Sequence, residues 1–325
     1  MARVLWRKIM EMQKPKIAYL FPGQGSQSVG MGKELFENIP EVKEVFSRAD
    51  NAVGFPLSRL CFEGPESALT LTENTQPALL ACSFAAYMAL GGLPEVGAGH
   101  SLGEYSAQVA AGGLRFEDAL RIVQQRGRFM QEAVPTGVGS MAAILGMDQA
   151  TIAAGLADVK SGLVEIANIN SDEQIVISGT KEGVDEAVKR LNPPRHVILP
   201  VSAPFHCALM KPAEERLAIV LDSTPFTDLH FPILANVDAK EVRTADPSRE
   251  ALKRQVSRAV RWAEIMETMI VKMEITMFIE IGPGKVLSQL IRKAARQSGK
   301  TVEVLNVEDM ASLRKTRDAL QKSRC

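Results

Sequence analysis

The sequence predicts an α/β fold in which a parallel sheet forms a large domain and a smaller βαββαβ domain is inserted into it. The first observation is G-x-S-x-G at Gly99, Ser101 and Gly103, which follows a short apolar run and precedes a helical pattern. A serine in this context lies on a turn between a strand and a helix. The second is a glycine-rich loop directly after the first apolar segment, and the third is a compact series of strand and helix patterns over 139–199.

The composition excludes several classes of protein. The 325 residues include 38 Lys+Arg and 38 Asp+Glu, so no overall charge favours nucleic acid or an anionic membrane surface. The four cysteines are scattered without C-x-x-C spacing, which favours a reducing cytoplasm over a disulfide framework or a metal site. The longest apolar stretch, 77–93, predicts a buried helix rather than a membrane span.

The N-terminal segment 1–15 has no continuous apolar run and is therefore not a secretory signal. It is expected to be a weakly structured extension, with an Arg-bearing organelle-targeting segment as the alternative. The expected large domain covers 16–137 and 201–325, and the expected inserted domain covers 138–200.

The first strand is expected over 16–21 and leads into the glycine-rich loop 22–32. The loop lacks both the Lys-Ser/Thr of a P-loop and the G-x-G-x-x-G spacing, so nucleotide binding is not favoured. Its glycines allow backbone N–H groups to approach an oxyanion near Ser101, or they form only a flexible turn.

Ser101 has two interpretations. In one, the glycines on either side lift its hydroxyl clear of the sheet beside free N–H groups of the following helix, which makes it a nucleophile. In the other, it is only the N-cap of that helix.

A helix over 116–133 carries Glu117 and Asp118 in its first turn, as the helix dipole favours. At ~100° per residue, Arg126 lies in the middle of the apolar face, and Arg121 and Arg128 lie on the opposite side. A buried guanidinium needs either an internal carboxylate or an anionic ligand.

The inserted domain is predicted from six elements in βαββαβ order, the order of ferredoxin-like folds. A cleft between the two domains is a natural binding site. The strands are expected over 140–145, 164–169, 174–179 and 196–199, and the helices over 148–157 and 181–191.

Four histidines could serve as a base for Ser101. His100 is its neighbour in sequence, so the His100 ring is expected to point away from the hydroxyl. His196 and His230 lie in apolar strand-like runs and are expected to be structural. His206 follows the loop back from the inserted domain and is expected to begin a helix over 207–221.

Two motifs in this order resemble the malonyl-CoA:acyl carrier protein transacylases and the acyltransferase domains of fatty acid and polyketide synthases. They are F-P-G-Q-G-S-Q at 21–27 and G-H-S-L-G-E at 99–104. The resemblance extends over 17–296. Further matches are Gln76-Pro77, Gln125-Arg126-Gly127, Ala167-Asn168-Ile169-Asn170, Pro204-Phe205-His206, Asn236-Val237 and Glu280-Ile281-Gly282-Pro283-Gly284.

This resemblance implies an α/β-hydrolase-like large domain and a ping-pong transfer of malonyl groups from malonyl-CoA to the phosphopantetheine thiol of acyl carrier protein, for fatty acid synthesis. It implies no permanently bound cofactor, and a monomer is expected. The implied roles are Ser101 as nucleophile, His206 as base, the Gln24 and Leu102 N–H groups as oxyanion hole, and Arg126, Gln255, Asn168, Asn170, Met130 and Phe205 as substrate-binding residues.

The match has one departure. Residues 255–262 follow the family's Q-x-x-x-P-V-x-W except at Ala259, where proline is usual. An ordinary amphipathic helix is the alternative for this stretch.

The C-terminal tail is expected to form a strand over 277–281, a turn over 282–284, a helix over 285–297 and a strand over 301–307. The basic residues of that helix and those at 254, 258 and 261 are weak candidates for docking an acidic carrier, or form only a solvated face. In the helix these residues are Lys285, Arg292, Lys293 and Arg296.

Two other functions remain open. A hydrolase would use the same serine but end at water, and a noncatalytic module would bind an acyl-CoA or a carrier without reacting. The joint presence of Ser101, His206 and Arg126 argues against the noncatalytic module.

Overall fold

The computed structural model describes residues 14–135, 137–201 and 203–323. Its larger sheet has six strands in the order β10-β9-β1-β2-β7-β8, and every neighbouring pair except β7–β8 is parallel. The predicted α/β class with a parallel sheet is confirmed. The strands are β1 (Ile17–Phe21), β2 (Val96–Gly99), β7 (Ile233–Leu234), β8 (Glu241–Val242), β9 (Met277–Ile281) and β10 (Glu303–Val307).

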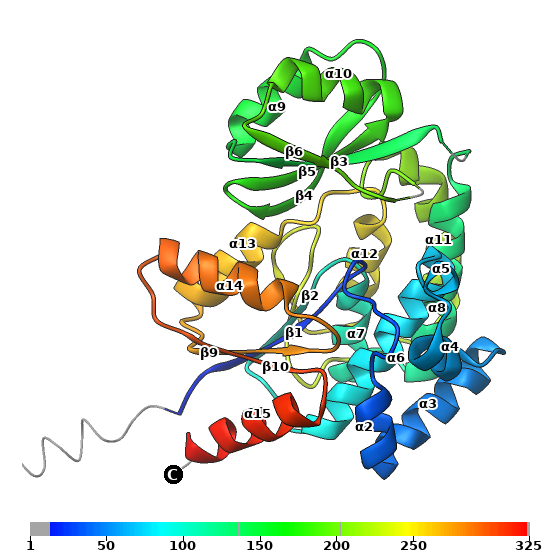
Figure 1. Cartoon of the computed structure of the whole chain (residues 1–325), viewed down its shortest axis with the longest axis vertical. Coiled ribbons are helices and arrows are strands. Elements are labelled where there is room, and N and C mark those ends of the chain that lie inside the picture. The colour runs from blue at the N-terminus through cyan, green and yellow to red at the C-terminus, as the bar shows by residue number, and fades with distance from the viewer. Residues whose placement is uncertain (1–13, 136, 202, 324–325) are drawn as a thin grey trace, which may run out of the picture.

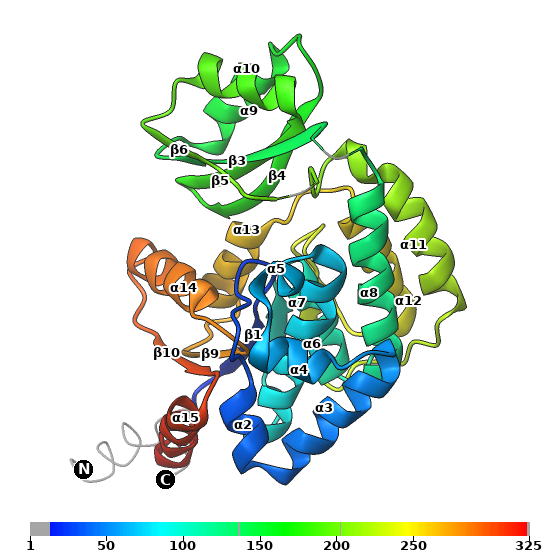
Figure 2. The same cartoon turned by 45° about the vertical axis from the view of Figure 1, so that its right-hand side comes forward.

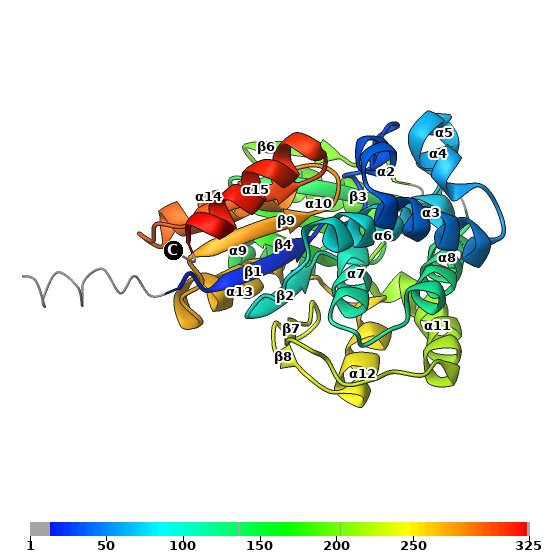
Figure 3. The same ribbon diagram turned by 90° about the horizontal axis from the view of Figure 1, so that it is seen from below.

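Helices cover both faces of this sheet (Figure 3). Alternation along β1 sends Tyr19 and Phe21 into one apolar core and Ala18 and Leu20 into the other. The first core packs against α6 (Thr72–Leu90), α7 (Leu102–Ala110) and α15 (Met310–Lys322); the second packs against α13 (Trp262–Glu267) and α14 (Val286–Gln297).

The sequence predicts no element over 33–69, where the structure has four helices. Three of them begin at or directly after Pro40, Pro56 or Pro65, because proline is tolerated at a helix start but not in the interior. The remaining elements outside 139–198 are α2 (Lys33–Asn38), α3 (Pro40–Val53), α4 (Leu57–Glu63), α5 (Glu66–Leu69), α8 (Phe116–Glu132), η1 (Ala208–Met210), α11 (Lys211–Ser223), α12 (Ala245–Gln255) and η2 (Thr268–Lys272).

The second sheet is antiparallel, in the order β4-β5-β3-β6, and lies above the carboxyl ends of the large sheet (Figures 1 and 2). Two helices pack on its outer face through Ile152 and Val184, and its inner face looks toward the large sheet. Along the chain, its elements are β3 (Gly139–Leu145), α9 (Gln149–Ala157), β4 (Val164–Ser171), β5 (Gln174–Thr180), α10 (Lys181–Leu191) and β6 (Arg195–Ile198).

Three predicted boundaries are wrong. Because Pro212 fits only in a first turn, the helix expected over 207–221 begins at Lys211, and His206 precedes a short 3-10 turn. The helix expected over 77–93 starts at Thr72 and stops before Gly91, which has a φ of 71°. Strand β4 continues to Ser171, so the asparagines expected at its end lie within it.

The segment 1–15 lies almost wholly outside the described residues. Within the part of the chain that the structure describes, no helix is both long and apolar enough to cross a membrane.

Candidate active site

The turn at Ser101 is a tight elbow that rests on strand β1. Its backbone angles, φ 52° and ψ −106°, are unusual for a residue other than glycine and are of the strained kind found at functional sites. The flanking glycines are required by close contact. A Cβ at Gly99 would lie 1.9 Å from the Gly103 carbonyl, and a Cβ at Gly103 would lie 2.0 Å from the Phe21 carbonyl oxygen. The packing therefore holds the serine hydroxyl above the sheet.

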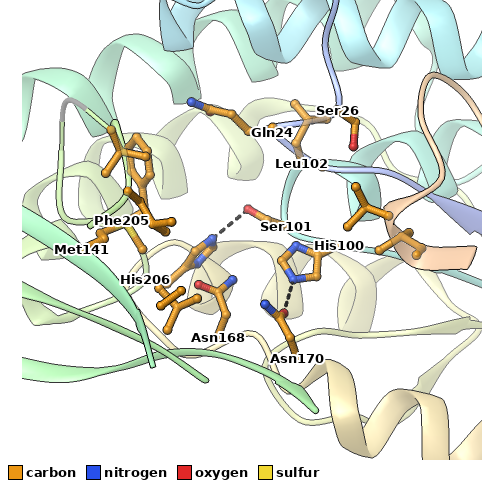
Figure 4. A pocket seen from close by; sticks show the side chains of 18 of the residues that line it. Gln24, Ser26, His100, Ser101, Leu102, Met141, Asn168, Asn170, Phe205 and His206 are labelled. Atoms are coloured by element: carbon orange, nitrogen blue, oxygen red, sulfur yellow. Dashed lines mark hydrogen bonds between the residues drawn. The ribbon is translucent and has the colours of Figure 1, made fainter. Parts of the chain in front are cut away.

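The loop after β1 lies against this elbow for the same reason. A Cβ at Gly23 would lie 2.3 Å from the His100 carbonyl oxygen, so only glycine permits the approach. Gln24 and Leu102 both line the cavity beside Ser101 (Figure 4). Neither backbone N–H donates a hydrogen bond to another described residue, and Leu102 opens helix α7. Two free N–H donors therefore border the hydroxyl.

Of the four histidines, His206 is the one that contacts Ser101, as the family resemblance implies. The Ser101 Oγ to His206 Nε2 distance is 2.7 Å, and His206 Nδ1 lies 2.9 Å from the backbone oxygen of Gln255 (Figure 4). A carbonyl oxygen only accepts, so Nδ1 carries the proton and Nε2 is left to accept from the serine. His196 and His230 are exposed, contrary to the expected structural role.

The environment of His206 keeps its imidazole neutral. Burial lowers its pKa to about 3, with the Arg126 charge acting in the same direction. In the folded protein the base form therefore persists well below the usual histidine pKa, whereas the unfolded chain takes up a proton near ~6.5. Its contribution to stability is present above pH ~6.5 and is lost as the pH falls toward 3.

We expect the rate of serine acylation to stay level as the pH falls from about 7 to about 5, with no inflection near ~6.5. The measurement is kcat/KM for malonyl-pantetheine, which has no phosphate titrating in this range. A tenfold loss per pH unit below 6.5 would show instead that His206 is solvated and ordinary.

Arg126 lies in α8 with its side chain 1% exposed, whereas Arg121 and Arg128 are exposed, as the helical winding predicts. Its Nη1 donates to Gln76 Oε1 at 2.9 Å, and its Nη2 donates to Gln255 Oε1 at 2.9 Å and to Ser101 Oγ at 3.2 Å. No carboxylate of the described residues forms an ion pair with it, and its Nε has no partner there. The internal ion pair that the sequence left open is therefore absent from this part of the chain.

Gln255 connects several of these groups. Its backbone oxygen holds His206, its Oε1 accepts from Arg126, and its Nε2 donates to the Ser101 carbonyl oxygen at 2.9 Å. It ends helix α12, so the amphipathic-helix alternative does not continue to Trp262. Its role as a substrate-binding residue stays a prediction.

Asn236 and Glu104 are two residues of the site for which the sequence predicted no role. Asn236 Oδ1 accepts from the Ser101 N–H at 2.7 Å, and its Nδ2 donates to Gly99 at 2.7 Å, which fixes the elbow from below. Glu104 is fully buried beneath Gln255. Glu104 could have been noticed in the sequence, because a buried acid needs partners and this one lies in the otherwise apolar helix pattern 104–111.

The inner face of the small sheet closes the cavity, which has a volume of about 360 Å³. His100 points away from the serine hydroxyl, as expected, and its Nε2 lies 2.9 Å from Asn170 Oδ1 across the two sheets (Figure 4). Its ring also packs against Trp262 at 5.5 Å between centroids. Met130, Asn168 and Phe205 line the same cavity.

Residues 18–322 match the family model for the acyl transferase domain. The chain belongs to the acyl transferase family. It is 48% identical over 301 residues to the malonyl CoA-acyl carrier protein transacylase of Bacillus subtilis, covering 90% of this chain and 94% of that protein. It is 45% identical over 286 residues to the protein of the same name from Escherichia coli K12, covering 86% and 92%.

Solved structures of acyl transferases share the fold. The malonyl CoA-acyl carrier protein transacylase of Coxiella burnetii has a TM-score of 0.90 and 39% identity, covering 94% of this chain and 98% of that one. A malonyl-transacylase solved in complex with its type II PKS acyl-carrier protein has a TM-score of 0.89 and 41% identity, covering 94% and 99%.

The departure at Ala259 is accommodated by pairing with the small sheet. The Val260 N–H donates to Ala167 and the Val260 oxygen accepts from Ile169, both at 2.9 Å, so β4 holds this backbone in place without proline. The Ala259 N–H donates to no described residue.

Ala259→Pro is therefore expected to leave the free energy of unfolding unchanged or to raise it by ~0.4–1 kcal/mol, because proline lowers the conformational entropy of the unfolded chain. Chemical denaturation measures this change, and the rate of serine acylation should be unaffected. A clear loss of stability would mean that the path of the chain at 259 does not suit proline.

Proposed function

We propose that this acyl transferase moves a malonyl group from malonyl-CoA to the phosphopantetheine thiol of acyl carrier protein, through a malonyl-serine intermediate, and so supplies extender units for fatty acid synthesis. The observation that carries the proposal is the buried Arg126, which has two amide oxygens and the nucleophile as partners but no described carboxylate. Its planar fork suits the free carboxylate of a malonyl group.

In the first half-reaction, His206 Nε2 takes the proton of Ser101 as Oγ attacks the thioester carbonyl. The negative oxygen that forms lies against the N–H groups of Gln24 and Leu102. The carbon–sulfur bond then breaks, and the leaving thiolate receives the proton from His206.

The second half-reaction reverses these roles. The carrier's pantetheine thiol gives its proton to His206 and forms the new carbon–sulfur bond, while Ser101 Oγ leaves and regains a proton. Met130, Asn168, Asn170 and Phe205 are proposed to shape the cavity around the acyl chain, because all four line it.

The intact mass of the protein tests this function. Malonyl-CoA should add the mass of one malonyl group, and holo carrier protein should then remove that group and gain it. If no adduct forms although the thioester binds, the noncatalytic module is the correct function.

Free malonate should accumulate far more slowly without carrier than the malonyl group is transferred with it. The side chains of Met130, Met141 and Phe205 bordering the cavity are 2%, 3% and 8% exposed, so little water reaches the ester. The two rates are measured by quantifying malonate and malonyl-carrier from one enzyme preparation. Equal rates would identify a hydrolase.

The finer classification of the fold is also proposed. The large domain, with its serine elbow on a mainly parallel sheet, is assigned as α/β-hydrolase-like over 16–137 and 201–325. The insert over 138–200 is assigned as ferredoxin-like, supported by its element order and antiparallel sheet. We also propose a cytoplasmic monomer without a bound cofactor, in keeping with the free, buried Cys61, Cys82 and Cys207.

Most of the basic candidates for carrier docking already have acidic partners. Among them, Arg258, Arg292 and Arg296 have no acidic partner among the described residues, although Arg292 donates to the Val304 backbone oxygen. Arg258 borders a hollow that reaches His206. The paired ones are Lys285 with Glu308, Lys293 with Glu173, Arg254 with Asp238 and Arg261 with Glu264.

A further inference from the structure

Glu104 is a buried acid beneath the nucleophile that the reaction above does not use. Its side chain is 0% exposed. Oε2 accepts from Gln255 Nε2 at 2.7 Å and from the Asn236 N–H at 3.0 Å, whereas no described group donates to Oε1. One oxygen is thus well solvated by protein donors and the other is not, so the ionised form is only half stabilised.

A single side chain connects this acid to the substrate-binding arginine. Gln255 accepts from Arg126 Nη2 through Oε1 and donates to Glu104 through Nε2. The same Nε2 also donates to the Ser101 carbonyl oxygen. Glu104 therefore fixes which way the Gln255 amide faces, and it opposes the Arg126 charge across that amide.

The balance of charge between Glu104 and Arg126 changes when a malonyl group binds. Its carboxylate brings a second negative charge to one guanidinium in a site from which water is largely excluded. An acetyl group brings no charge. A bound malonyl group therefore disfavours the ionised form of Glu104, whereas a bound acetyl group does not.

We infer that Glu104 is a positioning residue that, above neutral pH, is an anion in the empty site and takes up one proton from solvent when an acyl group bearing a carboxylate binds at Arg126. The proton forms an O–H bond at Oε1, so the negative charge of Glu104 no longer competes with the substrate carboxylate for Arg126. Oε2 keeps its two hydrogen bonds. This inference rests on the proposed function, since it requires a malonyl group at Arg126.

Two charged side chains act on Glu104 from neighbouring segments. Arg126 from α8 favours its anion, and Asp238, in the turn between β7 and β8, disfavours it. Asp238 is itself ion-paired with Arg254. Tyr105, next to it in α7, has a pKa raised by burial and stays neutral, as does His206. Burial dominates and raises the pKa of Glu104 to about 7, so a further negative charge is enough to favour protonation near neutral pH.

The test is the ratio of kcat/KM for malonyl-pantetheine to kcat/KM for acetyl-pantetheine between pH 6 and pH 9. Titrations shared by the two thioesters cancel in this ratio. In the wild type, the ratio should be level below about pH 7 and fall by up to ~10-fold per pH unit above it, because ionised Glu104 then competes for Arg126.

Glu104→Gln should give a level ratio, at or above the wild-type ratio at pH 9. Its amide oxygen can still accept from Gln255 and Asn236, so the geometry is retained while the charge is lost. A purely structural role would instead lower both activities equally at every pH. A wild-type ratio that does not change with pH, or a Glu104→Gln ratio with the wild-type slope, overturns the inference.

A second measurement does not depend on the folding of that variant. Ser101→Ala protein should bind both thioesters without reacting, and calorimetry at pH 8 in buffers of different ionisation enthalpy counts the protons taken up. Up to one proton is expected with malonyl-pantetheine and none with acetyl-pantetheine; equal uptake overturns the inference. If wild-type protein forms no malonyl adduct at all, the proposed function has failed instead.

Discussion

Ser101→Ala is expected to abolish both the malonyl adduct and transfer to the carrier, while the protein remains folded. The Ser101 hydroxyl touches His206 and Arg126 and packs little apolar surface. Removing this hydroxyl should lower the free energy of unfolding by no more than ~1 kcal/mol, the net value of an ordinary hydrogen bond. Loss of a nucleophile, in contrast, removes the covalent route altogether. Intact mass after incubation with malonyl-CoA, together with a thermal melt, measures both effects.

Ser106→Ala is the matched control for this variant. Ser106 lies in helix α7, which begins directly after Ser101, and it is 1% exposed. Its hydroxyl has no partner among the described residues, so the same substitution should leave the adduct intact. An adduct that persists on Ser101→Ala protein would place the nucleophile elsewhere.

Arg126→Ala is expected to lower malonyl transfer strongly and acetyl transfer little. Truncating one partner of a buried charge pair costs ~2–5 kcal/mol. This corresponds to a loss of ~30-fold to several thousand-fold in kcat/KM for malonyl-CoA. Acetyl-CoA has no carboxylate to lose, and the buried guanidinium disfavours it in the wild type, so its activity should be unchanged or improved.

The fold of this variant needs its own check, because the Gln76 and Gln255 amide oxygens lose a buried donor at a cost of ~1–3 kcal/mol. Arg128→Ala is the matched control, since Arg128 lies on the exposed face of the same helix. If malonyl and acetyl activities fall by the same factor in folded Arg126→Ala protein, the arginine is structural and the substrate carboxylate is bound elsewhere.

Local patterns predicted much of this molecule. The G-x-S-x-G turn, the helix that buries Arg126 and the six elements of the insert follow from glycine spacing and apolar periodicity within short windows. Predictions from such short windows were wrong at several helix boundaries. Pro212 moved the start of α11, and three of the four helices of 33–69 are too short for a periodic signal. The fourth, α3, has 14 residues and buries Val42, Phe46 and Ala49 at helical spacing, so its pattern was readable in the sequence and was missed.

The sequence by itself determined the elbow, the buried face of α8 and the candidate nucleophile, because these depend on neighbouring residues and on backbone preferences. Only the tertiary structure brought His206 within 2.7 Å of a serine 105 residues away, and only it left Arg126 without a described carboxylate. It also placed Glu104 and Asn236 under the elbow. These contacts join segments far apart in the chain, and their distances follow from how the sheets and helices pack, which no local pattern encodes.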